Sequence, residues 1–372
     1  MTKIFLNTLK QKLMRQSNEI NFDGKTIFCG IDVHKTSWSI CLLMEDRVLK
    51  RFSQPPGVKA LEKTLKSQYP GAIYMAVYEA GFCGFYPQRQ MAERGIACIV
   101  VNPSDVPTMD KEKRQKSDHI DCAKLARSLS AKQLIGIHIP DIQQQDDRCI
   151  IRNYKQFVKD QTRCKNRISS ALYFQGMTPR LLDQDGKRVY WSKNYIRQLK
   201  AMTMGTVEAR RSLDLLIENY ENARHQVLVA IRELRKLAKE DRYKTQVKLI
   251  RSVVGIGEVG AMLFLTQIGD FKRFKGLDPL ASYVGLIPNT HSSGEHETVS
   301  GLTHRGHARL REVLIEASWR AVSLDPAMTL AFSNYCKRMK KNRAIIAIAK
   351  KLLARIRFVM IHQQPYVSSV VA

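Results

Sequence analysis

Two short apolar segments, each ending at a carboxylate, constrain what the first third of this chain can form. Residues 27–33 have the β-branched and apolar character of a buried strand, and Asp32 interrupts that segment near its end. Residues 73–78 form a second such segment, which Glu79 terminates just before Ala80 and Gly81. Because an unpaired carboxylate is costly to bury, both acids are expected to emerge at a strand end or to bind a partner.

The neighbouring segments place these two strands in a mixed α/β domain. Further strands are predicted at residues 38–44, 48–52 and 96–101, and helices at 58–68 and 86–94, the latter ending at Gly95. The order βββαβαβα is typical of a mixed sheet covered by helices, and the domain closes near residue 140.

From residue 142 to about 239 the sequence is charged and helical. One stretch has apolar residues in alternating steps of four and three, with Arg224 as the one misfit: Leu213, Ile217, Tyr220, Val227, Ile231, Leu234 and Ala238. This spacing favours a coiled-coil arm, but about four heptads are equally compatible with one apolar face of an ordinary helical bundle.

A third region begins near residue 247. Gly255, Gly257 and Gly260 open a helix there, and they allow either close approach of the backbone to a phosphate or simple packing at a turn between helices. A polar loop, NTHSSGEHETVSG, and a basic helix at 305–322 follow. We therefore predict a basic leader at 1–24, an α/β domain at 25–140, a helical linker at 141–245 and a mainly helical domain at 246–372.

Charge favours a polyanionic partner. Lys and Arg number 61 against 34 Asp and Glu, a net charge of +27, which makes nucleic acid the first candidate and an anionic membrane surface the alternative. No apolar run reaches the roughly 20 residues of a spanning helix, and no signal-peptide core is evident at the N-terminus, so we expect a soluble intracellular protein. The eight cysteines form no CxxC pair, which argues against a cysteine zinc site and a disulfide framework.

Several basic residues are candidates for nucleic-acid contacts. Residues 337–357 contain nine Lys and Arg and no acid, so pairing within a helix cannot neutralise them. For each set of basic residues, the alternative is a helical face that is simply exposed to solvent. His291, His296, His304 and His307 lie nearby and suit phosphate contacts or surface positions better than metal binding. The candidates for nucleic-acid binding are Arg305, Arg309, Arg311, Lys337, Arg338, Lys340, Lys341 and Arg343.

A second pair of acids completes a candidate metal site. Asp118 and Asp121 are three residues apart, so on a helix they share one face, with Cβ atoms roughly 5–6 Å apart. Such a pair is stable at an exposed helix N-terminus or around a divalent cation. Together with Asp32 and Glu79 they offer hard oxygen ligands for Mg²⁺ or Mn²⁺. Two such ions can promote displacement at a phosphodiester.

At this point the motifs resemble a known family. FCGIDVHKTSWSI, VYEAG, QKSDHIDCAKLA, VGIGEVGA, FKGLDPLASYVGLIPNTHSSGEHET and THRGHARLREVLIEASWRA occur in this order over residues 25–340. They resemble the DEDD-type insertion-sequence transposases, whose N-terminal domain is similar to the RuvC resolvase of the RNase H fold. The resemblance implies that the metal ligands are Asp32, Glu79, Asp118 and Asp121. It also implies a serine nucleophile in the C-terminal domain, with Ser293 favoured over Ser292.

The resemblance further implies a reaction and partners. Serine attack on donor and target double-stranded DNA would form a covalent linkage that allows strand exchange, guided by a noncoding bridge RNA. The family implies a homodimer that assembles into a tetramer, in the cytoplasm of a bacterium or archaeon and associated with the nucleoid. One departure is that Glu295 and Glu297 stand where many relatives have a second glycine and basic residues. The alternatives are a structure-selective, metal-dependent endonuclease that uses water, and a noncatalytic nucleic-acid-binding protein.

Overall fold

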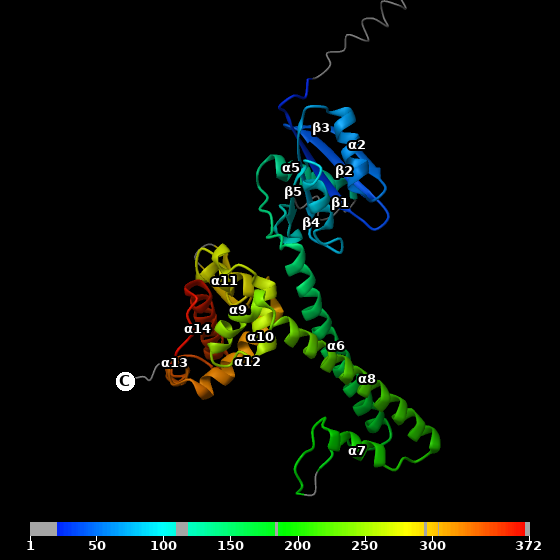
Figure 1. Cartoon of the computed structure of the whole chain (residues 1–372), viewed down its shortest axis with the longest axis vertical. Helices are drawn as coiled ribbons and strands as arrows, with labels where there is room; N and C mark the ends of the chain where they lie inside the picture. Colours follow the sequence, from blue (N-terminus) through cyan, green and yellow to red (C-terminus); the bar gives the residue numbers. More distant parts are fainter. Residues whose placement is uncertain (1–20, 109–117, 183–184, 294–295, 304, 369–372) are drawn as a thin grey trace, which may run out of the picture. The chain divides into compact units, whose positions relative to one another are not determined.

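The computed structural model divides the chain into two compact units, Met1–Ile139 and Pro140–Ala372 (Figure 1). It describes residues 21–108, 118–182, 185–293, 296–303 and 305–368, and only the backbone of Asp118 and of residues 290–293 and 296–300. Most of the predicted basic leader, together with Glu295 and His304, lies outside the described residues.

A five-stranded mixed sheet forms the centre of the first unit. Its strands are β1 (Thr26–Val33), β2 (Trp38–Met44), β3 (Arg47–Gln54), β4 (Ile73–Glu79) and β5 (Ala97–Val101), in the spatial order β3-β2-β1-β4-β5. The first three strands pair antiparallel, whereas β1 with β4 and β4 with β5 pair parallel. The predicted α/β domain with a mixed sheet is therefore confirmed.

Helices cover both faces of this sheet. Successive residues of a strand point to opposite faces, so Ile27, Cys29 and Ile31 lie on one face of β1. On that side they form a core with α2 (Val58–Gln68) and α3 (Tyr86–Ala92). On the opposite face, α5 (Asp118–Ser130) packs against the sheet through small residues that include Cys122 and Ala126. A short 3₁₀ helix, Pro103–Asp105, follows β5.

Gly30 in β1 permits the close approach of α5 to the sheet. A Cβ atom at this position would lie 2.0 Å from the carbonyl oxygen of Cys122 and 2.5 Å from the backbone nitrogen of Ala126. Both neighbours are backbone atoms of α5, so neither can move aside without moving the helix. The missing side chain of Gly30 thus sets the distance between α5 and the strand that carries Asp32.

Two long helices dominate the first part of the second unit. The end of α6 (Ile142–Phe174) packs against the start of α8 (Val207–Leu237) through Ile168 and Leu213, whereas Ile151 near the start of α6 packs with Leu234. The two helices therefore run antiparallel, side by side in Figure 1, and α7 (Lys193–Ala201) joins the same core. The apolar stripe predicted in α8 is largely buried within the chain, and burial against the antiparallel α6 fits both a coiled-coil arm and a helical-bundle face.

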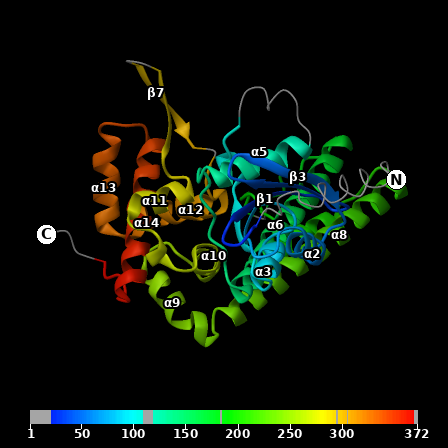
Figure 2. The same ribbon diagram turned by 90° about the horizontal axis from the view of Figure 1, so that it is seen from above.

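The remaining elements form a second, larger core. They are α9 (Asp241–Ser252), α10 (Glu258–Ile268), a 3₁₀ helix (Phe271–Arg273), α11 (Leu277–Val284), β6 (Pro288–Ser293), β7 (His296–Leu302), α12 (Ala308–Leu324), α13 (Pro326–Cys336) and α14 (Lys341–His362) (Figure 2). The helices bury a continuous apolar cluster, which confirms a mainly helical C-terminal region. No helix in the described ranges is long and apolar enough to span a membrane.

Gly255 shows the packing role that the sequence left open as one of two alternatives, and one neighbouring expectation needs revision. Gly255 has φ +94°, and a Cβ there would lie 2.3 Å from the carbonyl oxygen of Ala317, so this glycine lets the turn before α10 pack on α12. The segment expected to be a polar loop instead contains the antiparallel pair β6 and β7, in which Ser293 is paired with His296. Polar strands of this kind lack the apolar alternation that marks a strand in a sequence.

The contact at Gly30 yields a stability prediction. Gly30→Ala inserts a methyl group against the α5 backbone, and such overpacking typically costs about 1–3 kcal/mol. Gly81→Ala in the same unit is the matched control, because its added Cβ would meet only the Glu79 carbonyl oxygen, at 3.9 Å. We expect Gly30→Ala to lower the urea midpoint of the first unit and Gly81→Ala to leave it nearly unchanged. Equal midpoints for the two variants would contradict the close packing of α5.

Candidate functional site

Two of the candidate acids lie on adjacent strands at the same end of the sheet. Ile31 of β1 is in register with Tyr78 of β4, so Asp32 and Glu79 each occupy the next position along parallel neighbours. Their side chains therefore point to the same face, which is the face that α5 covers. The side chains of both acids are partly exposed, 24% for Asp32 and 35% for Glu79, so the site is open to a ligand.

The third acid comes from α5. Asp121 accepts a hydrogen bond of 3.2 Å from the Lys124 ammonium group, which also lies 3.9 Å from Oε1 of Glu79. The Lys124 side chain is only 10% exposed, so its charge is held between the two carboxylates with little screening by water. Asp121 and Glu79 thus share one cation across the space between the helix and the sheet.

His34 lies on the other side of Asp32. Its Nε2 atom is 3.1 Å from Oδ2 of Asp32, and its ring is exposed. An imidazole in this position can orient the Asp32 carboxylate and can also contact a ligand that binds beside that carboxylate. From the sequence, contact of His34 with a substrate and a turn at the strand end were equally good interpretations.

The chemistry of this cluster suits a hard cation. Among the side chains that the structure describes, which exclude that of Asp118, no three His, Cys, Asp or Glu are grouped closely enough to hold a metal ion. The donors are nevertheless of the right type, because the Lys124 ammonium shows that Glu79 and Asp121 converge on one positive charge. Asp118 begins α5, one turn before Asp121, so its backbone lies at the same end of the helix.

Cys122, next to Asp121, is not a competing ligand. Burial, with additional effects of Cys41 and the negative charge of Asp32, raises the pKa of the Cys122 thiol to about 12. The thiol therefore remains protonated at neutral pH, and its Sγ donates a hydrogen bond to the His119 carbonyl oxygen. Since the thiolate is the form that binds metals, the donors here are oxygens.

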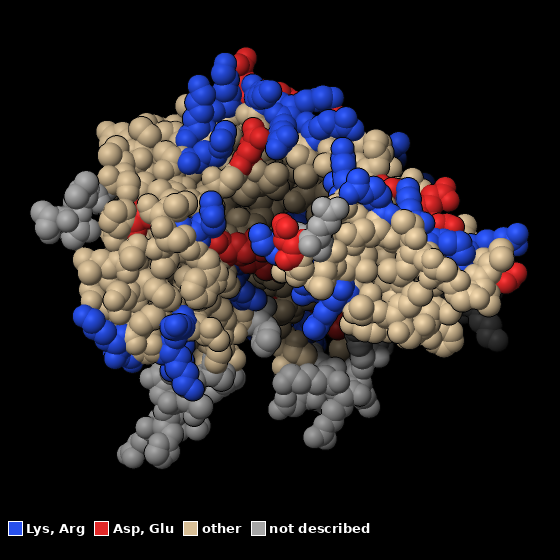
Figure 3. Space-filling model, turned by 90° about the horizontal axis from the view of Figure 1, so that it is seen from below, with Lys and Arg blue, Asp and Glu red and all other residues tan. Residues whose placement is uncertain are grey.

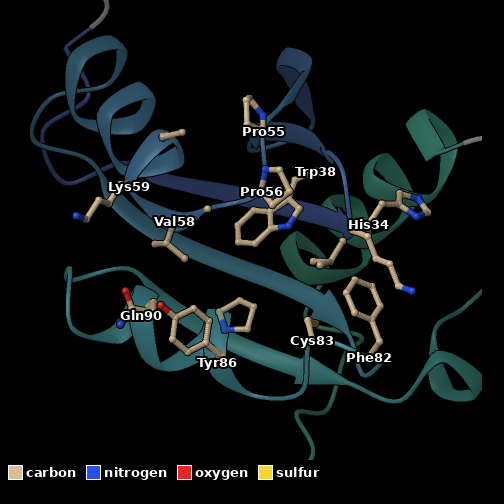
Figure 4. Close-up of a pocket in the computed structure, with 15 residues that line it drawn as sticks. His34, Trp38, Pro55, Pro56, Val58, Lys59, Phe82, Cys83, Tyr86 and Gln90 are labelled. Carbon is tan, nitrogen blue, oxygen red and sulfur yellow. The ribbon is translucent and has the colours of Figure 1, made fainter.

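A pocket opens at the same strand ends, on the opposite face of the sheet (Figure 4). It has a volume of about 550 Å³ and includes Val33 and His34, the two residues that follow Asp32. Trp38 and Pro56 lie on one side and Tyr86 on another, with Phe82 beside the end of the sheet. Sequence reasoning missed this pocket because its walls come from segments far apart in the chain.

The basic residues 337–343 lie at the connection between α13 and α14. All five predicted nucleic-acid-binding residues of this segment are exposed: Lys337, Arg338, Lys340, Lys341 and Arg343. The first turn of α14 has no acidic residue and no side-chain cap, although a helix N-terminus favours negative charge. These side chains and the helix end therefore attract the same anions. Figure 3 shows Lys and Arg side chains gathered in several groups over one face of the molecule.

The arginines before and within α12 differ in their surroundings. Arg305 is exposed, and Arg309 is partly buried in the first turn of the helix. Arg311 donates from Nη1 to the carbonyl oxygens of Gly285 (3.1 Å) and Thr303 (2.9 Å), so its guanidinium supports the packing of the preceding turns. The part of these three residues in nucleic-acid binding stays a prediction.

His307 has a structural role. Its Nδ1 accepts a hydrogen bond from the Leu310 backbone N–H and thereby caps α12, while Nε2 donates to Oε1 of Gln267. Burial, together with the positive charges of Arg309, Arg148 and Arg152, lowers the pKa of His307 to about 4. The imidazole is therefore neutral at physiological pH, which does not fit the phosphate contact expected for this histidine cluster.

A mixed sheet with acids at its strand ends and a covering helix that carries Asp121 is the arrangement expected of a transposase domain of the DEDD class. The family model for DEDD transposases of the IS110 type matches residues 29–175, and the model "Transposase IS116/IS110/IS902 family" matches residues 247–333. The two matches cover both units of the structure in the expected order. The chain belongs to the DEDD transposases of the IS110 type.

Relatives over the whole length support this assignment. The chain is 27% identical to y4rJ of Sinorhizobium fredii, with 91% of this chain and 92% of that protein covered. It is 24% identical to the transposase for insertion sequence element IS1111A of Coxiella burnetii, with coverage of 91% and 90%. A shorter match, 35% identical over 31% of this chain and 36% of the relative, is to the pilin gene-inverting protein of Moraxella bovis.

The buried cap at His307 gives a pH prediction. Unfolded histidine has a pKa of about 6.5, so between pH 6.5 and 4 the unfolded chain binds a proton that the folded chain excludes. Stability should be full above this window and fall by on the order of 2–3 kcal/mol as the pH drops through it. His307→Asn retains a capping side chain without titrating, so urea unfolding of this variant should depend less on pH. His225→Asn, at an exposed position of α8, should behave like the wild type.

Proposed function

We propose that this protein is a DNA recombinase of an insertion sequence and exchanges DNA strands through a covalent serine–DNA intermediate. The observation that carries the proposal is that Asp32 and Glu79 end adjacent strands on the same face of the sheet, while Glu79 and Asp121 share the Lys124 ammonium group. The assignment of the chain to the DEDD transposases of the IS110 type supports DNA as the substrate. The proposal concerns the nucleophile, the metal and the partners.

The carboxylates of Asp32, Glu79, Asp118 and Asp121 are proposed to hold Mg²⁺ or Mn²⁺. Such ions would polarise the scissile phosphate and stabilise the departing oxygen. The protein's own groups fix the geometry: Asp32 and Glu79 are set by strand register, and Asp121 by the packing of α5 at Gly30. Lys124 must give up part of its contact with Asp121 and Glu79 when another cation enters.

Ser293 is proposed as the nucleophile, with Ser292 as the near alternative. Attack by the hydroxyl oxygen on phosphorus forms a serine phosphodiester, the hydroxyl proton passes to solvent or to a nearby base, and one sugar oxygen leaves as a hydroxyl. A second sugar hydroxyl can later reverse these steps and release the serine. Ser293 is the last residue of β6, at the end of a two-stranded hairpin, and a hairpin end is well suited to reach into a bound duplex.

The basic surfaces are proposed to bind both DNA and a noncoding bridge RNA. The net charge of +27 and the exposed basic segment at 337–343 support polyanion binding but do not distinguish the two nucleic acids. A guide RNA would leave the choice of donor and target to base pairing, while the protein recognises backbone and shape.

The active assembly is proposed to be a dimer that pairs into a tetramer. The residues near the end of α6 support this, because Tyr173 and Phe174 are 60% and 88% exposed and offer apolar surface for a second subunit. In such an assembly the acids of one subunit can act with the serine of another. A metal-dependent nuclease that uses water is the alternative, and it requires no such serine.

Substitution of the site residues tests the reaction. Asp32→Asn and Asp121→Asn should each reduce strand exchange at least about 100-fold, because removing one group that stabilises transition-state charge typically costs that much. Asp46→Asn, at an exposed turn, is the matched control and should retain activity. Ser293→Ala should abolish the covalent protein–DNA adduct on denaturing gels, whereas Ser292→Ala should retain it. Cleavage that persists in Ser293→Ala would instead favour hydrolysis by water.

Mixing the variants tests the shared site. An equimolar mixture of Asp32→Asn and Ser293→Ala should regain part of the strand exchange if acids and serine come from different subunits. No recovery would contradict sharing between subunits and leave each site within one chain.

The salt dependence of binding tests the basic segment. Lys341→Gln and Arg343→Gln should each reduce the slope of log K against log salt by about 1 for the nucleic acid that this segment contacts. The measurement is made in parallel with duplex DNA and with RNA transcribed from the sequence flanking the gene. Lys63→Gln on α2 is the control and should leave both slopes unchanged. Unchanged slopes for the two test variants would remove this segment from the nucleic-acid interface.

A further inference from the structure

The pocket at the strand ends has the composition of a site for a flat aromatic ligand. Its walls include Trp38, Tyr86 and Phe82, together with prolines of the loop before α2 and Pro87 of α3. No acidic residue is among the residues that line it, whereas Lys35, Lys59 and His34 are. Aromatic faces with cations nearby and no acids favour a planar, electron-rich ring attached to a negative backbone.

Two of these aromatic residues are unusually exposed. Tyr86 is 68% exposed and Phe82 is 64% exposed, although both belong to segments that are firmly held to the sheet. Pro87 and Met91 of α3 are buried, and the backbone N–H of Ala80 donates to the Val101 carbonyl oxygen. Rigid aromatic rings left in solvent at the edge of a pocket are typical of binding positions.

The pocket and the carboxylate site meet at the end of β1, on opposite faces of the sheet. Asp32 and Val33 are consecutive, so they point to opposite faces, one toward α5 and the other into the pocket. His34 belongs to both, because its Nε2 lies 3.1 Å from Asp32 and the residue also lines the pocket. A strand of nucleic acid that crosses this end of the sheet can therefore present a phosphate on one side and a base on the other.

We propose that this pocket binds an unpaired nucleobase of the DNA strand whose phosphate lies at Asp32, Glu79 and Asp121. Tyr86 provides the stacking surface, Trp38 and Pro56 form the opposite wall, and Lys35 and Lys59 attract the neighbouring phosphates (Figure 4). The volume of about 550 Å³ lies within the usual range of small-ligand sites. This inference rests on the proposed function for its choice of DNA, because a strand held at the acids brings its own bases to the pocket.

Binding to a bulged duplex tests the proposal. The full-length protein is titrated, in Ca²⁺ to limit cleavage, with a DNA duplex that carries one unpaired thymine and with the same duplex carrying an abasic residue instead. Stacking of one base should make binding of the thymine bulge about 5- to 100-fold tighter. Tyr86→Ala should abolish this preference, and Tyr86→Phe should retain it. Ile73→Ala, an exposed residue at the opposite end of β4, is the control and should not affect the preference.

Several results would overturn the proposal. These are equal binding of the two duplexes by the wild-type protein, or a preference in Tyr86→Ala as large as in the control. A preference shown only by a uracil-bulged RNA duplex would assign the pocket to RNA and refute the DNA proposal. Tyr86 is exposed, so its truncation is not expected to unfold the unit, and thermal melting checks this directly.

The test also separates this inference from the proposed reaction. Asp32→Asn should lose strand exchange but keep the preference for the thymine bulge, since its carboxylate does not line the pocket. If Asp32→Asn keeps strand exchange, the proposed metal site is wrong, and the bulge preference of the wild type alone then decides the pocket proposal. If it loses strand exchange and the wild type shows no preference for the bulge, only the pocket proposal fails.

Discussion

The packing of α5 against β1 is the contact on which the carboxylate site depends. Asp32 and Glu79 are fixed by hydrogen bonding within the sheet, whereas Asp121 is carried by α5, whose backbone lies close to the strand because residue 30 is glycine. The small residues Cys122 and Ala126 complete that contact. A larger residue at any of these positions would move Asp121 away from the strand ends. The small size of these side chains therefore sets the geometry of the site.

Much of the first unit could be predicted from local sequence. The strands β1 and β4 have β-branched or apolar residues that are buried in the sheet, and the acids stand out because they interrupt that pattern. The hairpin of β6 and β7 could not be predicted in this way, because neither strand has an apolar face in its sequence. In the sequence, the local signal of a turn was the glycine that follows Ser293.

Features that depend on distant segments were also missed. Lys124 lies one turn after Asp121, a spacing visible in the sequence, but its approach to Glu79 requires the fold to bring α5 onto β4. The pocket combines a strand end, the loop before α2 and the start of α3. For His307 the sequence suggested a function where the structure shows a packing role. A histidine near basic residues suggested phosphate binding, yet its ring caps a helix and hydrogen-bonds to Gln267.

The position of Lys124 has a thermodynamic consequence. Its ammonium group acts as an internal counterion, so the carboxylates of Glu79 and Asp121 are already partly neutralised before any ligand arrives. A divalent ion that binds these oxygens must compete with a tethered charge whose effective concentration does not change. This competition weakens the binding of free divalent ions at the site. An ion binds there more readily when a phosphate supplies further ligands. The same lysine, once displaced, is a cation that can pair with that phosphate.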